Sequence, residues 1–353
     1  MPEPHRGVYA APLAPMRDDL GIDIEKYIAH CAHLLTEGCQ GLMPLGSTGE
    51  AHSFTVGERI EIMDALAESD LPKEKMLIGT SALALPDTIE LVRHAVSIGA
   101  GGVCVQPPFY YKPAEDIGLF DFFSRVIDGV ADDRLRLYVY DWESNLAVHH
   151  SLDFFHRLFD AYPKHAVGIK DSSGDAPMLE ERCRAFPGKE VFAGTDGMTL
   201  TCLRAGGAGI MSGASNIIPD VTTAIFAGYE TEAGATAQAR LGEIRAAMDG
   251  LPWFSALKAT MAWLSGDPSW RNARPAIRRL TAEEERTLQA SLTAIGLSPA
   301  HDRDFHPDHL PPRVLRQRRH PCRPQGRRHR PGDRRSGSSG EPGIALREMH
   351  PRV

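Results

Sequence analysis

The 353-residue sequence lacks the features of several protein classes. Its six cysteines are scattered without a C-x-x-C pair, which argues against a zinc site or a disulfide framework and favours a reducing compartment. No run reaches the roughly 18 apolar residues that a membrane-spanning helix needs. The first residues carry prolines and charges where a signal peptide would be apolar. We therefore expect a cytoplasmic protein.

Lysine is absent from residues 301–353, which hold 13 arginines and six acidic side chains. That net charge of +7 lies within a chain of net charge −7, so the first 300 residues carry −14. Proline, arginine, glycine, histidine and serine dominate this end, and such a composition predicts a disordered tail. A basic arm for nucleic acid is the alternative. No aromatic platform or binding module accompanies the charge, so we expect no nucleic-acid partner.

Eight short apolar runs recur through the first two-thirds of the chain, and each is typical of a buried parallel strand. They are Gly7–Leu13, Gly41–Leu45, Met76–Gly79, Gly102–Gln106, Leu135–Tyr140, Val167–Lys170, Val191–Ala193 and Ala208–Met211. Segments with helical spacing separate them. This alternation predicts an α/β fold, a (β/α)8 TIM barrel. A doubly wound sheet is the alternative, but no glycine fingerprint follows the first run.

Helix ends are marked by local signals. Thr55-x-x-Glu58 predicts a capping box, and Asp87 is the predicted cap of the following helix. After Met211 the pattern becomes entirely helical. The chain is thus predicted to divide into three parts: a barrel over 1–225, a C-terminal helical extension over 226–298, and the arginine-rich tail over 299–353.

Reactive groups of such barrels lie at the carboxyl ends of the strands. Lys170 ends one apolar run, where desolvation would favour a neutral amine that can attack a ketone and form a Schiff base. A lysine that reaches solvent is the alternative. Tyr140 ends another run, and its phenol could move a proton, or it could simply pack.

The turn Gly46-Ser47-Thr48-Gly49-Glu50 follows the second run. Its amides and hydroxyls could hold a carboxylate, or it could be a plain strand-to-helix turn. It lacks the lysine of a P-loop, which argues against nucleotide binding. The histidine pairs at 30/33 and 149/150 lack the convergent carboxylates of a metal site, so we predict no metal.

Several motifs together resemble the dihydrodipicolinate synthase/N-acetylneuraminate lyase family over about residues 7–295. They are the GSTGE turn, Gln106–Pro113 (QPPFYYKP), Tyr140, GIKDSSGD at 168–175 and Gly213-Ala214-Ser215-Asn216. The resemblance implies a (β/α)8 barrel with C-terminal helices, usually a homotetramer. It also implies a lyase or aldolase that runs class I Schiff-base chemistry on pyruvate or a 2-oxo acid without a metal or organic cofactor.

The resemblance further implies a role for each matching catalytic residue. Lys170 matches the Schiff-base lysine, and Tyr140 matches the acid/base tyrosine. Thr48 matches a threonine that is hydrogen-bonded towards that tyrosine. Tyr110 matches a tyrosine that in synthases reaches across a dimer interface to complete a proton relay.

Substrate-binding residues follow from the same resemblance. Ser47 and Thr48 match the pair that binds the substrate carboxylate. Gly194 and Met211 fall where the family lines the pyruvate site with backbone. Asp196 is a further candidate for a polar contact with the substrate.

The stretch after Tyr140 departs from the family. Asn145 stands where true synthases place an arginine for their second substrate, and an asparagine cannot make a bidentate charge-assisted pair. The motif PPFYYK at 107–112 and Ser47 resemble the lyase and keto-deoxy-sugar-acid aldolase side of the family, although sialic acid lyases have an acidic residue where Gly197 stands. We therefore favour a lyase or keto-deoxy-sugar-acid aldolase. The alternatives are 4-hydroxy-tetrahydrodipicolinate synthase, a sugar-acid dehydratase that uses the same imine, and a catalytically impaired barrel acting as a binding or scaffold protein.

The segment Asp141–His150 differs so much from its flanks that a local reading-frame shift is a further hypothesis, which resequencing would test. The sequence from about residue 300 invites the same hypothesis.

Overall fold

The computed structural model describes residues 3–299. Its eight strands form one parallel sheet in the order β2-β1-β8-β7-β6-β5-β4-β3. A parallel bridge between Leu42 and Met76 joins the two edges of that order. The strands are β1 (Gly7–Ala10), β2 (Gly41–Leu42), β3 (Leu77–Gly79), β4 (Gly102–Val105), β5 (Leu137–Asp141), β6 (Ala166–Asp171), β7 (Glu190–Ala193) and β8 (Gly209–Ser212). The predicted (β/α)8 barrel is confirmed.

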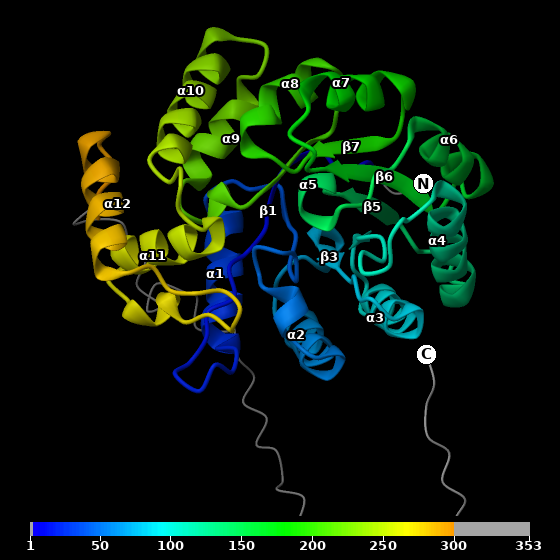
Figure 1. Cartoon of the computed structure of the whole chain (residues 1–353), viewed down its shortest axis with the longest axis horizontal. Coiled ribbons are helices and arrows are strands. Elements are labelled where there is room, and N and C mark those ends of the chain that lie inside the picture. Colours follow the sequence, from blue (N-terminus) through cyan, green and yellow to red (C-terminus); the bar gives the residue numbers. More distant parts are fainter. Residues whose placement is uncertain (1–2, 300–353) are drawn as a thin grey trace, which may run out of the picture. The chain divides into compact units, whose positions relative to one another are not determined.

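Helices alternate with these strands and surround them (Figure 1). They are α1 (Ile24–Thr36), α2 (Val56–Glu68), α3 (Leu85–Ser97), α4 (Asp116–Val130), α5 (Glu143–Leu146), α6 (Leu152–Ala161), α7 (Ala176–Ala185) and α8 (Thr199–Arg204). Four more helices follow β8: α9 (Pro219–Ala227), α10 (Glu232–Ala246), α11 (Trp253–Ser265) and α12 (Ala282–Ala294).

Local signals explain most helix starts. The predicted capping box of α2 is present, because Thr55 Oγ1 accepts from the Glu58 amide at 3.2 Å while Glu58 Oε2 accepts from the Thr55 amide at 2.8 Å. The prediction that Asp87 caps α3 is wrong. The N-cap is Ala84, and Asp87 lies inside the first turn, because Pro86 is well suited to an early helical position and lets the helix begin sooner.

Apolar side chains fill both faces of the sheet, as the continuous apolar runs predict. One layer packs between the strands and the helices that cover them. The barrel interior holds a separate cluster made of Tyr9, Ala11, Met43, Leu77, Cys104, Tyr138, Tyr140, Phe192, Ala208 and Met211. Side chains of alternate strand residues therefore point into a packed interior. The catalytic candidates Tyr140 and Lys170 lie near the carboxyl ends of their strands.

The C-terminal helices share a second apolar core with the barrel through Leu13 and Leu200. Figure 1 shows α11 close to α1, and Lys26 of α1 donates to Asp267 after α11 at 2.6 Å. Lys258 of α11 reaches the GSTGE turn, where its ammonium pairs with Glu50. The predicted boundary at residue 225 stays a prediction. Residues 300–353, most of the predicted tail, lie outside the described residues.

Candidate active site

Two neighbouring strands bring Lys170 and Tyr140 together. The two residues are direct partners in the register of β5 and β6. Lys170 Nζ lies 3.9 Å from the centroid of the Tyr140 ring. Both side chains are buried, with 5% and 4% of their surface exposed. The strand-end rule thus identified two side chains that the fold places in contact.

The Lys170 amine has an apolar neighbourhood. Its Nζ lies 3.4 Å from the sulfur of Met43 and contacts the Tyr140 ring. No carboxylate within residues 3–299 forms an ion pair with it. An amine that is not tied to a counter-ion is accessible to an electrophile, as Schiff-base chemistry requires.

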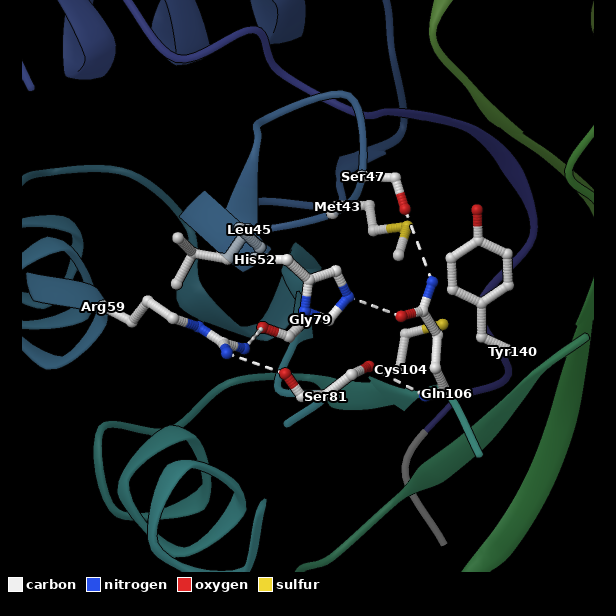
Figure 2. Close-up of a pocket in the computed structure, with 12 residues that line it drawn as sticks. Met43, Leu45, Ser47, His52, Arg59, Gly79, Ser81, Cys104, Gln106 and Tyr140 are labelled. Carbon is white, nitrogen blue, oxygen red and sulfur yellow. Dashed lines mark hydrogen bonds between the residues drawn. The ribbon is translucent and has the colours of Figure 1, made fainter. Parts of the chain in front are cut away.

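A small pocket adjoins Tyr140 and the turn after β2 (Figure 2). Gln106 bridges its polar side, since its Nε2 donates to Ser47 Oγ at 3.4 Å and its Oε1 lies 2.6 Å from His52 Nε2. Sequence analysis gave no role to Gln106, His52 or Met43. Gln106 directly follows β4, so the strand-end rule that found Lys170 could have found it too.

Arg59 forms the far wall of this pocket (Figure 2). It is buried, and its guanidinium donates to Ser81 O at 2.7 Å and to Gly79 O at 3.0 Å. Burial lowers the pKa of Arg59 to about 10, although the charge of Asp87 opposes the shift. The two bonds to carbonyl oxygens hold the end of β3 against α2, which fixes the shape of the pocket.

Thr48 is buried beside the pocket, but the expected hydrogen bond from Thr48 towards Tyr140 is not formed. Neither hydroxyl makes a hydrogen bond to another residue of the described range. The Thr48 Oγ1 lies close to Gly213, where an added Cβ would come within 3.2 Å of it. Both hydroxyls therefore have hydrogen-bonding capacity left for a substrate.

Three further predicted residues lie at the ends of β7 and β8. An added Cβ on Gly194 would lie 1.9 Å from Ser172 Oγ and 3.1 Å from Lys170 Cε, so the backbone approaches the lysine as only glycine allows. Met211 is buried in the barrel interior. Asp196 is buried and accepts from Ser212 Oγ at 2.6 Å. Burial raises the pKa of Asp196, although the Ser212 hydrogen bond opposes the shift.

Tyr110 is not part of this group. It lies in the loop after β4 with 71% of its surface exposed, and it packs edge-to-face on the still more exposed Tyr111 at 5.2 Å. Within a single chain, Tyr110 is therefore a surface residue. A role in proton transfer would require a second chain.

The segment Asp141–His150 is integrated into the fold. It contains α5, which sequence analysis did not predict. Asp141 and His150 are both buried and lie 3.0 Å apart, and Leu146 and Val148 pack into the main core. A shifted frame would place side chains without regard to the fold. The buried contact between Asp141 and His150 therefore counts against the frame-shift hypothesis, which resequencing would test.

Together these features define a class of protein: a (β/α)8 barrel with a buried lysine and tyrosine at the carboxyl ends of adjacent strands. Within residues 3–299, no cluster of three or more histidine, cysteine or acidic side chains could hold a metal ion. In the same range, no helix is long and apolar enough to cross a bilayer.

The model of the dihydrodipicolinate synthetase family matches residues 4–295, and the chain belongs to that family. A DapA-like lyase of Chloroflexus aurantiacus is 30% identical over 298 residues, which cover 84% of this chain and 98% of that protein. A 4-hydroxy-tetrahydrodipicolinate synthase of Gluconacetobacter diazotrophicus is 27% identical, over 83% of this chain and 97% of its own.

Solved structures agree on the fold. The crystal structure of dihydrodipicolinate synthase from Agrobacterium tumefaciens has a TM-score of 0.77 and 25% identity, and the match covers 82% of this chain and 99% of that one. A prophage protein of the same family from E. coli K12, solved in complex with pyruvate, has a TM-score of 0.75 and 24% identity, over 82% and 98%. Relatives of this chain carry the names DapA-like lyase and 4-hydroxy-tetrahydrodipicolinate synthase, and this chain has the barrel of that family.

Proposed function

We propose that the chain is a class I Schiff-base lyase that acts on pyruvate or a 2-oxo acid and cleaves or forms a carbon–carbon bond with an aldehyde. The observation that carries this proposal is the pairing of Lys170 with Tyr140, with Lys170 Nζ 3.9 Å from the ring centroid and both side chains buried at the strand ends. A primary amine beside a phenol supplies the nucleophile and the proton carrier that imine formation needs.

The steps follow from these groups. The Lys170 amine attacks the C2 ketone, and the resulting carbinolamine loses water to give an imine. The protonated imine takes up the electron pair left at C3 when the aldehyde departs, or supplies it to an incoming aldehyde. Tyr140 moves the proton at the aldehyde oxygen. Because the imine is itself the electron sink, this chemistry requires no metal or organic cofactor.

The substrate carboxylate would be held by Ser47 and Thr48. Ser47 faces the pocket, and the Thr48 hydroxyl has no partner among the described residues. Hydroxyls and backbone amides of a glycine-flanked turn suit a carboxylate. Gly194 supports the proposal because its backbone lies close to the side chains of Ser172 and Lys170, and Met211 belongs to the same buried interior as Tyr140.

Asn145 favours the lyase over 4-hydroxy-tetrahydrodipicolinate synthase, the name of several relatives. It is exposed on α5 and offers no guanidinium for a second carboxylate. A sugar-acid dehydratase remains the second candidate, since loss of water at C4 begins with the same imine. The buried Asp196–Ser212 pair supports a substrate with polar groups beyond the 2-oxo acid.

We further propose a cytoplasmic homotetramer with a small-molecule 2-oxo acid as its partner. Tyr110, Tyr111 and Ile117 are exposed large apolar side chains, which would be covered in an assembly. The five described cysteines are free, as a reducing compartment would keep them.

Borohydride reduction in the presence of pyruvate tests the proposal. We expect a covalent adduct that peptide mass spectrometry locates at Lys170 and that Lys170→Ala abolishes. Lys189→Ala is the matched control. Lys189 is partly buried, but it donates to Pro163 O and Ala166 O at the amino ends of the strands, away from the pocket. Absence of an adduct in the wild-type protein would favour the catalytically impaired barrel.

A screen of sugar-derived 2-oxo acids then separates the remaining alternatives. Release of pyruvate identifies an aldolase, and loss of water without pyruvate identifies a dehydratase. Formation of 4-hydroxy-tetrahydrodipicolinate from pyruvate and a four-carbon amino-acid aldehyde would instead identify the synthase and overturn the argument from Asn145.

A further inference from the structure

Two carboxylates lie directly behind the reacting pair. Asp141 follows Tyr140 and Asp171 follows Lys170, and the two aspartates are themselves partners in the β5–β6 register. Successive strand residues point to opposite faces of a sheet. Since Tyr140 belongs to the barrel interior, the aspartates face the covering helices, and both are buried there.

Arg182 of α7 bridges these two carboxylates. Its Nη2 lies 2.5 Å from Asp141 Oδ2, and its Nη1 lies 2.5 Å from Asp171 Oδ2. All three side chains are at most 3% exposed. The guanidinium is planar and rigid, so the spacing of its two nitrogens sets the spacing of the two strand ends.

The remaining carboxylate oxygens are also satisfied. His150 Nδ1 lies 3.0 Å from Asp141 Oδ1, and Asp171 Oδ1 accepts from the amide and hydroxyl of Ser173 at 2.9 and 2.6 Å. Burial acts to raise the pKa of Asp141, but its contacts with His150 and Arg182 outweigh burial and lower it. Asp141 is therefore held as a carboxylate, and each carboxylate oxygen of the two aspartates has a hydrogen-bond partner.

The network also ties the backbone of the strand ends. The Ser172 amide donates to Asp141 O at 2.8 Å, and the Gly194 amide donates to Asp171 O at 2.6 Å. A movement of either aspartate would therefore move the chain that carries Tyr140 or Lys170. Reacting groups need alignment on the ångström scale, and a misplacement of about 1 Å can cost roughly 100-fold in rate.

We propose that Arg182 is a positioning residue that keeps Tyr140 aligned with Lys170 by bridging Asp141 and Asp171. The inference rests on the proposed function, because it assigns the two strand residues their reaction. A lysine at position 182 would keep the positive charge but present a single ammonium in place of the two-nitrogen fork.

Hydrogen–deuterium exchange at C3 of pyruvate tests the alignment without an aldehyde. The Lys170 imine forms with loss of water, and Tyr140, which acts as the base when no aldehyde is present, removes a C3 proton to give the enamine. A deuteron from D2O then adds to C3, and hydrolysis of the imine with one water restores the amine and releases deuterated pyruvate. NMR follows the exchange, and borohydride trapping measures the imine separately. We expect Arg182→Lys to retain at least half of the trapped adduct while exchange falls at least 10-fold.

Arg184→Lys is the matched control, because Arg184 lies on the same helix in an exposed pair with Glu180. It should leave both readouts within 2-fold of wild type. If Arg182→Lys does not fold, Asp141→Asn replaces it, since the amide keeps an acceptor oxygen but loses the charge. We expect the same separation of the two readouts, with exchange reduced 3- to 10-fold.

Three outcomes would overturn these ideas, and they can be told apart. Without a wild-type adduct, the proposed function itself fails. With a wild-type adduct, exchange by Arg182→Lys at the wild-type rate refutes the positioning role. Adduct and exchange that fall together, in proportion to the folded fraction seen by circular dichroism, would reduce Arg182 to a structural residue.

Discussion

Two tyrosines on β5 differ in what their hydroxyls touch. Tyr138 and Tyr140 stand two residues apart and both belong to the barrel interior. The Tyr138 hydroxyl donates to the carboxylate of Glu190. The Tyr140 hydroxyl has no hydrogen bond within residues 3–299, and its ring lies against Lys170. Residue type and strand thus do not distinguish Tyr138 from Tyr140, whereas the partners of their hydroxyls support a structural role for Tyr138 and fit the reactive role that we propose for Tyr140.

The same contrast holds for the two ends of the barrel. At the amino ends of the strands, Glu190 also accepts from the Arg136 guanidinium and from the His5 amide. Tyr9 donates to His5 Nδ1 at 2.7 Å. At the carboxyl ends, Lys170, Tyr140 and Thr48 have few polar partners. Barrels place chemistry at the carboxyl ends and stability at the opposite face, and this molecule follows that division.

Exchanging each tyrosine for phenylalanine should give the largest effect. We expect Tyr140→Phe to lower the rate of pyruvate release roughly 10²- to 10⁴-fold, the usual contribution of a general acid or base, with stability unchanged. Tyr138→Phe should keep the rate within about 3-fold but lose about 2 kcal/mol of stability, because Glu190 loses a charged hydrogen bond. Steady-state kinetics and urea unfolding of both variants measure the two effects.

The proposed difference between a structural Tyr138 and a reactive Tyr140 is refuted if Tyr138→Phe slows the reaction as much as Tyr140→Phe while both proteins stay equally stable. Trapping with borohydride adds a control, since both variants keep Lys170 and should still form the adduct, with Tyr140→Phe forming it more slowly.

Removing the charge of Glu190 should give the next largest effect. Glu190→Gln leaves the Arg136 guanidinium, which is 12% exposed, without its carboxylate. Loss of one partner of a buried ion pair costs about 3 kcal/mol. The midpoint of urea unfolding should fall accordingly, while the yield of borohydride adduct below that midpoint should not change.

Glu180→Gln is the control for that variant, because the Glu180–Arg184 pair is exposed and should contribute less than about 1 kcal/mol. Equal destabilisation by the two changes would show that the buried contacts at the amino ends of the strands have no special stabilising role.

The sequence predicted the barrel and the reacting pair for one physical reason. Continuous apolar runs mark strands buried on both faces, and the carboxyl ends of parallel strands meet. That reasoning located Lys170 and Tyr140 without any tertiary information. The error at Asp87 has a different cause: a good cap residue was chosen, although Pro86 allows the helix to begin at Leu85, with Ala84 as its N-cap.

Tertiary partners could not be predicted in the same way. Arg182 of α7 meets Asp141 and Asp171 only because the tertiary fold brings its side chain to the ends of β5 and β6, and no periodicity in the sequence records that contact. The four-residue α5 is too short to show a helical period. The contact between His150 and Asp141 was missed as well, because a comparison of sequence motifs does not show which residues become neighbours in the fold.

The smallest expected effect concerns how the stability contributed by His5, at the amino ends of the strands, depends on pH. Burial lowers the pKa of His5 below its usual 6.5, although its bond to Gly101 O and the charge of Glu190 oppose the shift. A neutral ring that donates from Nε2 to Gly101 O and accepts from Tyr9 at Nδ1 fits both contacts. The unfolded chain therefore takes up the proton first. Stability from His5 is complete above pH 6.5 and declines as the pH falls below that value.

His5→Asn should thus cost about 1 kcal/mol at pH 7.5, the value of one neutral hydrogen bond, and less at pH 5. The measurement is the difference between the urea-unfolding free energies of wild type and variant across that range. Taking the difference cancels the contribution of His30, whose pKa burial lowers to about 4 in both proteins. A difference that stays constant with pH would mean that His5 packs against the barrel without titrating. The contacts at the amino ends of the strands would then owe their stabilising effect to the Glu190–Arg136 ion pair rather than to the hydrogen bonds of His5.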